Sequence, residues 1–183
     1  MIDLKKILSD KESIAISAHI RPDGDAFGSA LAMYNYIRKK YPDKKTDIYL
    51  LDPNPLFGFL PGYEDIKTEP SDEKYDLFIA LDMGDPDRLG KNKKMLDAAK
   101  DVVCVDHHLN YKNLATEANS YVVPDASSTA ELVYDLVNED LEKFYDRLEA
   151  VKDYGDEYKT YGGCREDVQC SVQFIYKTEG IGE

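Results

Sequence analysis

Short apolar runs alternate with amphipathic stretches along the first 138 residues. Helices are predicted where apolar residues recur at three- and four-residue spacing, in residues 2–10, 26–40 and 128–137, and a polar helix is predicted over residues 91–100. Strands are predicted where the runs are apolar almost throughout, in residues 14–18, 46–51, 76–81, 102–105 and 121–123. Strands of this kind, alternating with helices, indicate an α/β fold with a five-stranded parallel sheet and helices on both faces.

The pattern changes after residue 138. Residues 139–153 have the spacing of an amphipathic helix, and residues 168–176 mostly alternate between apolar and polar, as in a half-exposed antiparallel strand. We therefore expect one domain over residues 1–138 and a short helix and strand over residues 139–183. A Pro/Gly-rich loop at residues 52–63 carries several apolar side chains, which we expect to pack on the core rather than line a cleft.

The loop after the first predicted strand places His19, Asp23 and Asp25 within seven residues. An imidazole and two carboxylates at the carboxyl end of a strand suit a divalent cation such as Mn²⁺. A calcium loop does not fit, because Tyr34 stands where the bidentate Glu should be. A phosphate loop lacks its Gly-Lys-Ser/Thr. The remaining alternative is a plain turn with a core histidine, in which Asp25 caps the following helix.

Two further strands end in side chains of the same kind. The third predicted strand is followed by Asp82, and the fourth by Asp106, His107 and His108, so every histidine of the chain lies in these motifs. Parallel strands end at one edge of the sheet, and carboxylates gathered there need a cation to offset their repulsion. Mixed sets of His and Asp ligands suit Mn²⁺ or Fe²⁺ and are compatible with Zn²⁺. They suit Mg²⁺ less well, because so many of the ligands are imidazoles. Unrelated turns and capping residues are the alternative.

The charge of the chain limits the class of ligand. With 36 acidic and 23 basic residues, the net charge is −13, which argues against tracking along long nucleic acid. A small anionic substrate whose charge is met by bound metal stays compatible. The sequence has no apolar run long enough for a membrane span and no signal-peptide layout at its start.

The cysteines point to the cytoplasm. Three cysteines, an odd number, favour reduced thiols over a disulfide framework, and they are Cys104, Cys164 and Cys170. The last two have no histidine nearby, so we expect no zinc site there.

Four short motifs together resemble the DHH phosphoesterase superfamily over roughly residues 1–138. They are His19-Ile-Arg-Pro-Asp23-Gly-Asp25-Ala-Phe-Gly28-Ser29, Asp82 with Arg88-Leu89-Gly90, Asp106-His107-His108, and Ser127-Ser128-Thr129-Ala130-Glu131. The last motif also reads as a capping box. The Asp-Gly-Asp-Ala form and Arg-Leu-Gly are similar to the branch of nanoRNase/pAp phosphatases and RecJ-like exonucleases rather than to the manganese pyrophosphatases.

The resemblance implies two metal ions, most readily Mn²⁺, that share one carboxylate. His19, Asp23 and Asp82 would hold one ion, while Asp25, Asp82 and His107 would hold the other. His108 would face the scissile phosphate, and Asp106 would orient an imidazole rather than bind metal. Arg88 would contact phosphate, or alternatively pair with Asp85 or Asp87. His108 and Arg88 are therefore the candidate catalytic and phosphate-binding residues.

The sequence departs from the family pattern in its last part. We find no Asp-Thr-Gly-type fourth motif, and no histidine follows His108; Asp153 and Asp156 are the nearest replacement carboxylates. Residues 139–183 then read as a linker helix and an incomplete remnant of the family's substrate-binding domain. The unpaired edges of such a sheet are compatible with a homodimer.

The expected activity is metal-dependent hydrolysis of phosphoesters. Its substrates would be small nucleotides, such as a nucleoside 3′,5′-bisphosphate, or short oligonucleotides, with no binding of long double-stranded nucleic acid or membrane. Two classes stay open beside it: a non-catalytic module that binds metal or nucleotide, and a pyrophosphatase-like enzyme.

Overall fold

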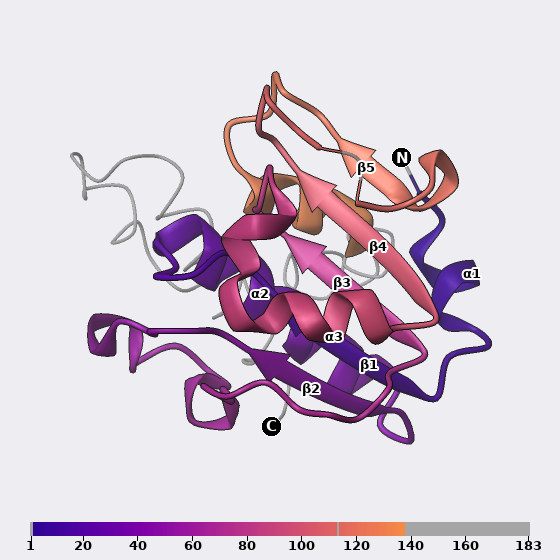
Figure 1. Ribbon diagram of the computed structural model, residues 1–183, viewed down its shortest axis with the longest axis horizontal. Coiled ribbons are helices and arrows are strands. Elements are labelled where there is room, and N and C mark those ends of the chain that lie inside the picture. Colours follow the sequence, from indigo (N-terminus) through magenta and orange to yellow (C-terminus); the bar gives the residue numbers. More distant parts are fainter. Residues whose placement is uncertain (1, 113, 138–183) are drawn as a thin grey trace, which may run out of the picture.

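One five-stranded sheet forms the centre of the molecule (Figure 1). The computed structural model describes residues 2–112 and 114–137. The strand order is β2-β1-β3-β4-β5, and each neighbouring pair is parallel. The strands are β1 (Ser13–Ser17), β2 (Lys45–Tyr49), β3 (Leu77–Leu81), β4 (Asp101–Asp106) and β5 (Ser120–Val122). The predicted five-stranded parallel α/β sheet is confirmed, with strand bounds that shift by one or two residues.

Helices cover both faces of the sheet, and Figure 1 shows α3 in front of it with α2 behind. The helices are α1 (Leu4–Leu8), α2 (Gly24–Lys40), α3 (Lys93–Ala98) and residues 129–137. Ile79 of β3 packs with α1, α2 and residues 132–137, whereas Phe78 packs with α3 on the other face. Alternate residues of β3 therefore contribute to two cores, which is why this strand is apolar throughout.

The first turn of α2 corrects one expectation. The helix begins at Gly24, and its N-cap is Asp23, whose side chain accepts hydrogen bonds from the amides of Asp25 and Ala26. The alternative role of Asp25 as the cap of this helix is therefore excluded. Asp25 lies inside the first turn, where its buried carboxylate is free to serve a different helix.

The loop after β2 packs on the core only in part. It contains the 3₁₀ turns η1 (Pro55–Phe57) and η2 (Tyr63–Asp65). The ring of Phe57 lies 4.5 Å from that of Phe27, and Leu60 is buried. Leu56 and Phe59 remain 77% and 55% exposed, so the expectation of core packing fails for these two. A 3₁₀ turn directs successive side chains to different sides, so a short loop cannot bury all of them.

The helix at residues 129–137 begins with a modified capping box. The hydroxyl of Ser128 accepts the amide of Glu131 at 3.1 Å, as expected. The carboxylate of Glu131, however, accepts the amide and hydroxyl of Ser127 at 2.8 and 2.7 Å instead of the Ser128 amide. The start of this helix is therefore tied by two side chains, although not in the reciprocal form of the motif.

Three further features complete the comparison with the sequence. The polar helix expected over residues 91–100 is the shorter α3, which follows the 3₁₀ segment η3 (Pro86–Asn92). The helix and strand predicted within residues 139–183 lie outside the described residues, as do Cys164 and Cys170. Within the described part of the chain, no helix has both the length and the hydropathy that a membrane span requires.

Candidate metal centre at the carboxyl edge of the sheet

Three loops converge where β1, β3 and β4 end. These strands are neighbours in the sheet, with β3 in the middle. Asp82 directly follows β3, while His19 follows β1 and His107 follows β4. The topology therefore places Asp82 between the two imidazoles, at the edge where open α/β sheets bind ligands.

Asp82 is the central residue of the cluster. Its side chain is almost fully buried, and its backbone takes a left-handed conformation with a φ of 53°. Its Oδ2 lies 3.7 Å from Nε2 of His19, and its Oδ1 lies 3.6 Å from Nε2 of His107. The two oxygens of one carboxylate thus face two different histidines. Such a strained backbone at a buried acid is typical of functional sites.

The first group of ligand atoms consists of His19, Asp23 and Asp82. Nε2 of His19 lies 3.8 Å from Oδ1 of Asp23. Nδ1 of His19 lies 2.9 Å from the Ile20 carbonyl, which holds the proton on that nitrogen and leaves the Nε2 lone pair facing the carboxylates. Separations near 3.7 Å are too long for hydrogen bonds but allow one cation to contact both atoms.

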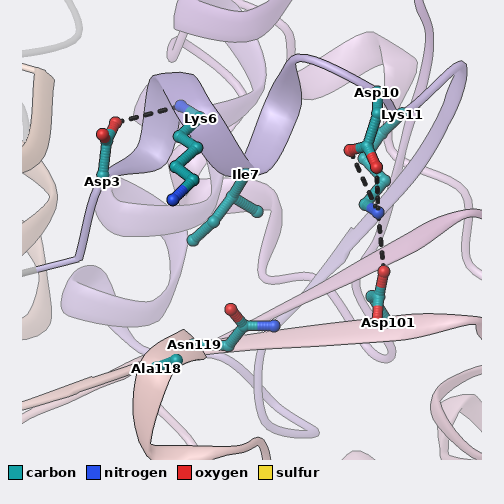
Figure 2. Close-up of a pocket in the computed structure, with 8 residues that line it drawn as sticks. All are labelled: Asp3, Lys6, Ile7, Asp10, Lys11, Asp101, Ala118 and Asn119. Carbon is teal, nitrogen blue, oxygen red and sulfur yellow. Dashed lines mark hydrogen bonds and ion pairs between the residues drawn. The ribbon is translucent and has the colours of Figure 1, made fainter.

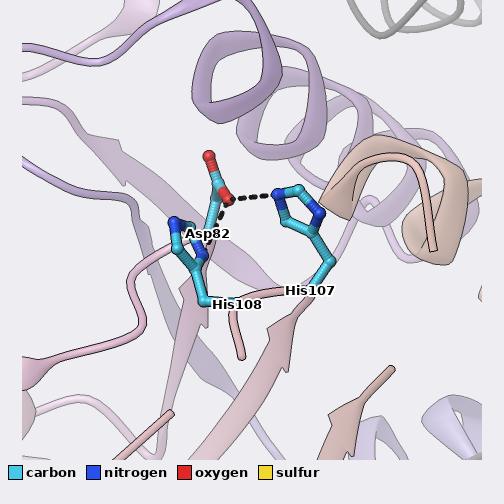
Figure 3. Close-up of side chains that lie close together, drawn as sticks. All are labelled: Asp82, His107 and His108. Atoms are coloured by element: carbon cyan, nitrogen blue, oxygen red, sulfur yellow. Dashed lines mark ion pairs between the residues drawn. The ribbon is translucent and has the colours of Figure 1, made fainter. Parts of the chain in front are cut away.

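The second group consists of Asp25, Asp82 and His107. Nε2 of His107 lies 3.6 Å from Oδ2 of Asp25 as well as 3.6 Å from Asp82. Figure 3 shows the rings of His107 and His108 directed at the same carboxylate of Asp82. The ligand atoms of Asp82, His107 and His108 also lie within 4.8 Å of one another. Nδ1 of His108 donates its proton to Asp106 and so has no lone pair for a cation, whereas each oxygen of Asp25 accepts a single amide and keeps a second lone pair.

Asp106 is the hydrogen-bond partner of Nδ1 of His108. It is fully buried, and its Oδ1 accepts the ring Nδ1–H of His108 at 2.6 Å and the His108 amide at 2.9 Å. Its Oδ2 accepts the amides of Met83, at 2.9 Å, and Gly84. With both oxygens occupied by donors, Asp106 orients the imidazole instead of facing the cluster.

Arg88 lies on the outer side of His108. Its Nη1 lies 3.1 Å from Nε2 of His108 and donates to the Met83 carbonyl at 3.2 Å. With Nδ1 donating to Asp106, Nε2 is the acceptor for the guanidinium. The structure thus joins the Arg-Leu-Gly segment to the histidine pair, and this places one fixed positive charge beside the cluster.

Burial and mutual repulsion set the charge state of the carboxylates. Burial, together with the nearby charge of Asp82, raises the pKa of Asp25 to about 6. Burial and the charge of Asp23 likewise raise the pKa of Asp82. Asp23 behaves differently, because the neighbouring imidazole of His19 and the amides of Ala26 and Asp25 lower its pKa to about 2. Two buried acids that resist ionisation, facing imidazole lone pairs, are a donor set that a divalent cation fits.

Thr129 is a part of the site that the sequence did not reveal. Its hydroxyl donates to Oδ1 of Asp82 at 3.0 Å, and its amide donates to Oδ2 of Asp25 at 2.8 Å. The amide of Ala130 donates to the other oxygen of Asp25, also at 2.8 Å. The motif around Thr129 indicated only a helix start, and no periodicity in the sequence connects it with Asp82.

A hollow in the surface lies away from this cluster. It has a volume of about 400 Å³ and is bordered by Lys6 of α1 and by Lys11 and Asp101 at the opposite end of the sheet (Figure 2). The ammonium of Lys11 pairs with Asp10 and, at 2.6 Å, with Asp101. Three of its charged groups are therefore paired with each other, and none of the predicted site residues is among those that border it.

Known proteins resemble this chain in sequence and in fold. It is 29% identical over 138 residues to the bifunctional oligoribonuclease and PAP phosphatase NrnA of Bacillus subtilis, covering 73% of this chain and 41% of that protein. It is 28% identical over 149 residues to the cyclic-di-AMP phosphodiesterase PdeA of Listeria monocytogenes, covering 73% of this chain and 22% of that protein. The chain thus spans less than half the length of each of these relatives.

A solved structure shares the fold. An exopolyphosphatase-related protein from Bacteroides fragilis superposes with a TM-score of 0.67 at 19% identity, over 96% of this chain and 55% of that one. The family profile described as the N-terminal domain of the DHH family matches residues 13–158. The resemblance expected from the four motifs is confirmed, and the chain belongs to the DHH family of phosphoesterases.

Proposed function

We propose that this chain hydrolyses phosphoester bonds in small nucleotides or short oligonucleotides, using two Mn²⁺ ions. The observation that carries the proposal is the orientation of the Asp82 carboxylate. One of its oxygens faces His19 and the other faces His107. Two ions close together are a usual arrangement for phosphoester hydrolysis, and a carboxylate with one oxygen toward each histidine is suited to hold such a pair. The names of the relatives, an oligoribonuclease and phosphatase and a cyclic-dinucleotide phosphodiesterase, support the same reaction class.

The two ions share Asp82 in this proposal and differ in their other ligands. His19, Asp23 and Asp82 hold one ion, while Asp25, Asp82 and His107 hold the other. When bound, the ions supply Lewis acidity that activates water and offsets the charge of the phosphate. Asp153 and Asp156, the acids nearest to the missing fourth motif, lie outside the described residues.

Arg88 and His108 complete the site on the substrate side. The guanidinium, 3.1 Å from Nε2 of His108, offers a fork of donors that suits phosphate oxygens. Asp106 keeps the His108 ring in one orientation, with Nδ1 as the donor, so that Nε2 faces Arg88 and the substrate. A chain with a net charge of −13 needs such local positive charge to attract an anionic substrate.

Domain organisation is part of the same proposal. Residues 1–138 supply the metal-binding phosphoesterase domain, and residues 139–183 supply a linker helix and part of a substrate-binding region. The site described above lies wholly within the first of these two parts.

The test is release of inorganic phosphate from a nucleoside 3′,5′-bisphosphate in the presence of Mn²⁺. Di- and trinucleotides, a cyclic dinucleotide and pyrophosphate are assayed in parallel. Asp82→Asn should abolish turnover, whereas Asp72→Asn, which changes an exposed carboxylate paired with Lys94, should not. Turnover of pyrophosphate alone would favour the pyrophosphatase alternative. Mn²⁺ binding without turnover of any substrate would contradict the proposal and favour a non-catalytic module.

A further inference from the structure

Thr129 lies at a position from which it touches both carboxylates of the second ligand group. The residue is fully buried at the start of the helix that covers residues 129–137. Its hydroxyl donates to Oδ1 of Asp82 at 3.0 Å, and its amide donates to Oδ2 of Asp25 at 2.8 Å. One residue thus holds the two acids that face His107.

The hydroxyl limits how the Asp82 carboxylate can rotate. Oδ1 of Asp82 is the oxygen that faces His107, at 3.6 Å, while Oδ2 faces His19, at 3.7 Å. Rotation about the last side-chain bond would remove both oxygens from these directions, and this torsion is a soft one in aspartate. The donor from Thr129 selects the rotation in which each oxygen faces one histidine.

The start of the helix is itself held in place. Ser128 accepts the amide of Glu131, and the Glu131 carboxylate accepts both the amide and the hydroxyl of Ser127. The Thr129 hydroxyl is therefore presented from a capped and buried turn, which lowers the entropic cost of keeping it aimed at Asp82.

We infer that Thr129 is a positioning residue whose hydroxyl orients Asp82 so that its two oxygens serve two separate ions. The inference rests on the proposed two-ion function and deepens it. It assigns to this hydroxyl the binding of the ion on the His107 side, which requires Oδ1 of Asp82. The ion on the His19 side would be held by His19, Asp23 and Oδ2 of Asp82, so its affinity should depend less on Thr129.

The test is Mn²⁺ binding to the metal-free protein, measured without substrate by titration and by the electron paramagnetic resonance signal of free Mn²⁺. Thr129→Val keeps the shape and the amide that bonds Asp25 but removes the hydroxyl. We expect this variant to lower the affinity for one of the two ions by roughly tenfold or more. An effect of this size is typical for the loss of a hydrogen bond to a charged group. Thr129→Ser should restore wild-type binding of both ions.

A matched control separates positioning from general loosening of the helix. Ser127→Ala removes a hydroxyl from the same helix start, but that hydroxyl bonds Glu131 and not the cluster. It should bind both ions as the wild type does. His107→Ala should weaken binding of the same ion as Thr129→Val does, and the double variant should bind that ion little more weakly than His107→Ala.

The outcomes are distinct for the inference and for the function. Wild-type affinity for both ions in Thr129→Val, or equal losses in Ser127→Ala, would overturn the inference and leave the function standing. A wild-type protein that binds two ions without hydrolysing any substrate would overturn the function alone. A wild-type protein that binds fewer than two ions would overturn both.

Discussion

The carboxylate of Asp25 accepts the backbone amide of Thr129 at 2.8 Å, although 104 residues separate them. Its second oxygen accepts the amide of Ala130 at the same distance, so one buried acid in the first turn of α2 caps the helix that begins at residue 129. The positive end of that helix faces the carboxylate, which is the favourable direction. This contact connects the first sequence motif of the site to the last.

Replacing Asp25 with Ala should therefore destabilise the metal-free protein. Two buried amides would lose their acceptor, and an unsatisfied buried donor costs about 1–3 kcal/mol. We expect the free energy of unfolding to fall by about 2 kcal/mol or more, measured by urea denaturation in chelator at pH 3.5. This pH lies below the pKa of this carboxyl in the unfolded chain as well as below its raised pKa of about 6 in the folded protein, so the raised pKa contributes little to the difference.

Asp23→Ala is the matched control for that prediction. Asp23 caps α2 from an exposed position in the same loop, so its loss should cost about 1 kcal/mol, as for other N-caps. A smaller loss for Asp25→Ala than for Asp23→Ala would contradict the role of Asp25 as the buried cap of the second helix.

The sequence predicted the sheet and the placement of the three loops because both depend on local pattern. An apolar run with a single acid at its end, as at Asp82, identifies both a buried strand and the side chain that the strand delivers to the sheet edge. Parallel topology then brings such ends to one edge without any knowledge of side-chain contacts. This is why the residues expected at the site, from His19 to His108, lie together in the structure.

Contacts between segments distant in the chain could not be predicted in this way. Asp23 and Asp25 both suit an N-cap, and the difference between them is the pair of amides at Thr129 and Ala130, which bind only Asp25. The bond from Thr129 to Asp82 spans 47 residues and depends on how the last described helix docks on the sheet. Neither contact leaves a periodic trace in the sequence.

Asp82→Asn should change the pH dependence of stability in the metal-free protein. The folded-state pKa of Asp82 is raised, so the folded protein holds its proton more tightly than the unfolded chain does. Stability is then lost as the pH rises through the range between the unfolded pKa and the folded pKa. Asn carries no such proton and tolerates the left-handed backbone at this position. The variant should therefore melt higher than the wild type at pH 7.5 and similarly at pH 4.

Added Mn²⁺ should reverse that order. The ion binds the ionised carboxylate, so the wild type should gain melting temperature at pH 7.5 while Asp82→Asn gains little. Differential scanning calorimetry with chelator and with Mn²⁺ measures both parts. If the metal-free variant melts lower than the wild type at pH 7.5, Asp82 is not the repelled buried acid that its burial indicates.

Gly84→Ala should impair catalysis more than metal binding. Gly84 has a φ of +61°, and an added Cβ would lie 3.3 Å from Cβ and Cγ of His108. The ring of His108 would have to move, because the three atoms nearest to that Cβ all belong to this residue. We expect kcat to fall roughly tenfold or more, a stability loss of about 1–3 kcal/mol from the strained backbone, and Mn²⁺ affinity close to wild type.

The control for Gly84→Ala is Gly58, an exposed glycine whose backbone is in the right-handed helical region, where alanine is not strained. Gly58→Ala should leave kcat unchanged, although its added Cβ also comes within 3.1 Å of a backbone oxygen. A Gly84→Ala enzyme with normal kcat would show that His108 does not need its present orientation for turnover.

Arg88→Lys should weaken substrate binding while leaving the metal centre intact. Arg88 reaches His108 and the Met83 carbonyl through Nη1, and the rest of its planar fork remains for a phosphate. Lysine keeps the charge but offers a single ammonium, so KM for a nucleoside 3′,5′-bisphosphate should rise roughly tenfold, with a larger rise for Arg88→Gln.

Lys112→Gln is the control for the loss of positive charge, because its ammonium pairs with Asp85 on the same loop system and is not directed at His108. It should change KM by less than about twofold, since the effect of an exposed charge is screened by salt. If Arg88→Lys lowers kcat at unchanged KM, Arg88 acts on His108 and not on the substrate phosphate. Equal rises in KM for Arg88→Gln and Lys112→Gln would mean that the net charge of this edge, and not the guanidinium fork, attracts the substrate.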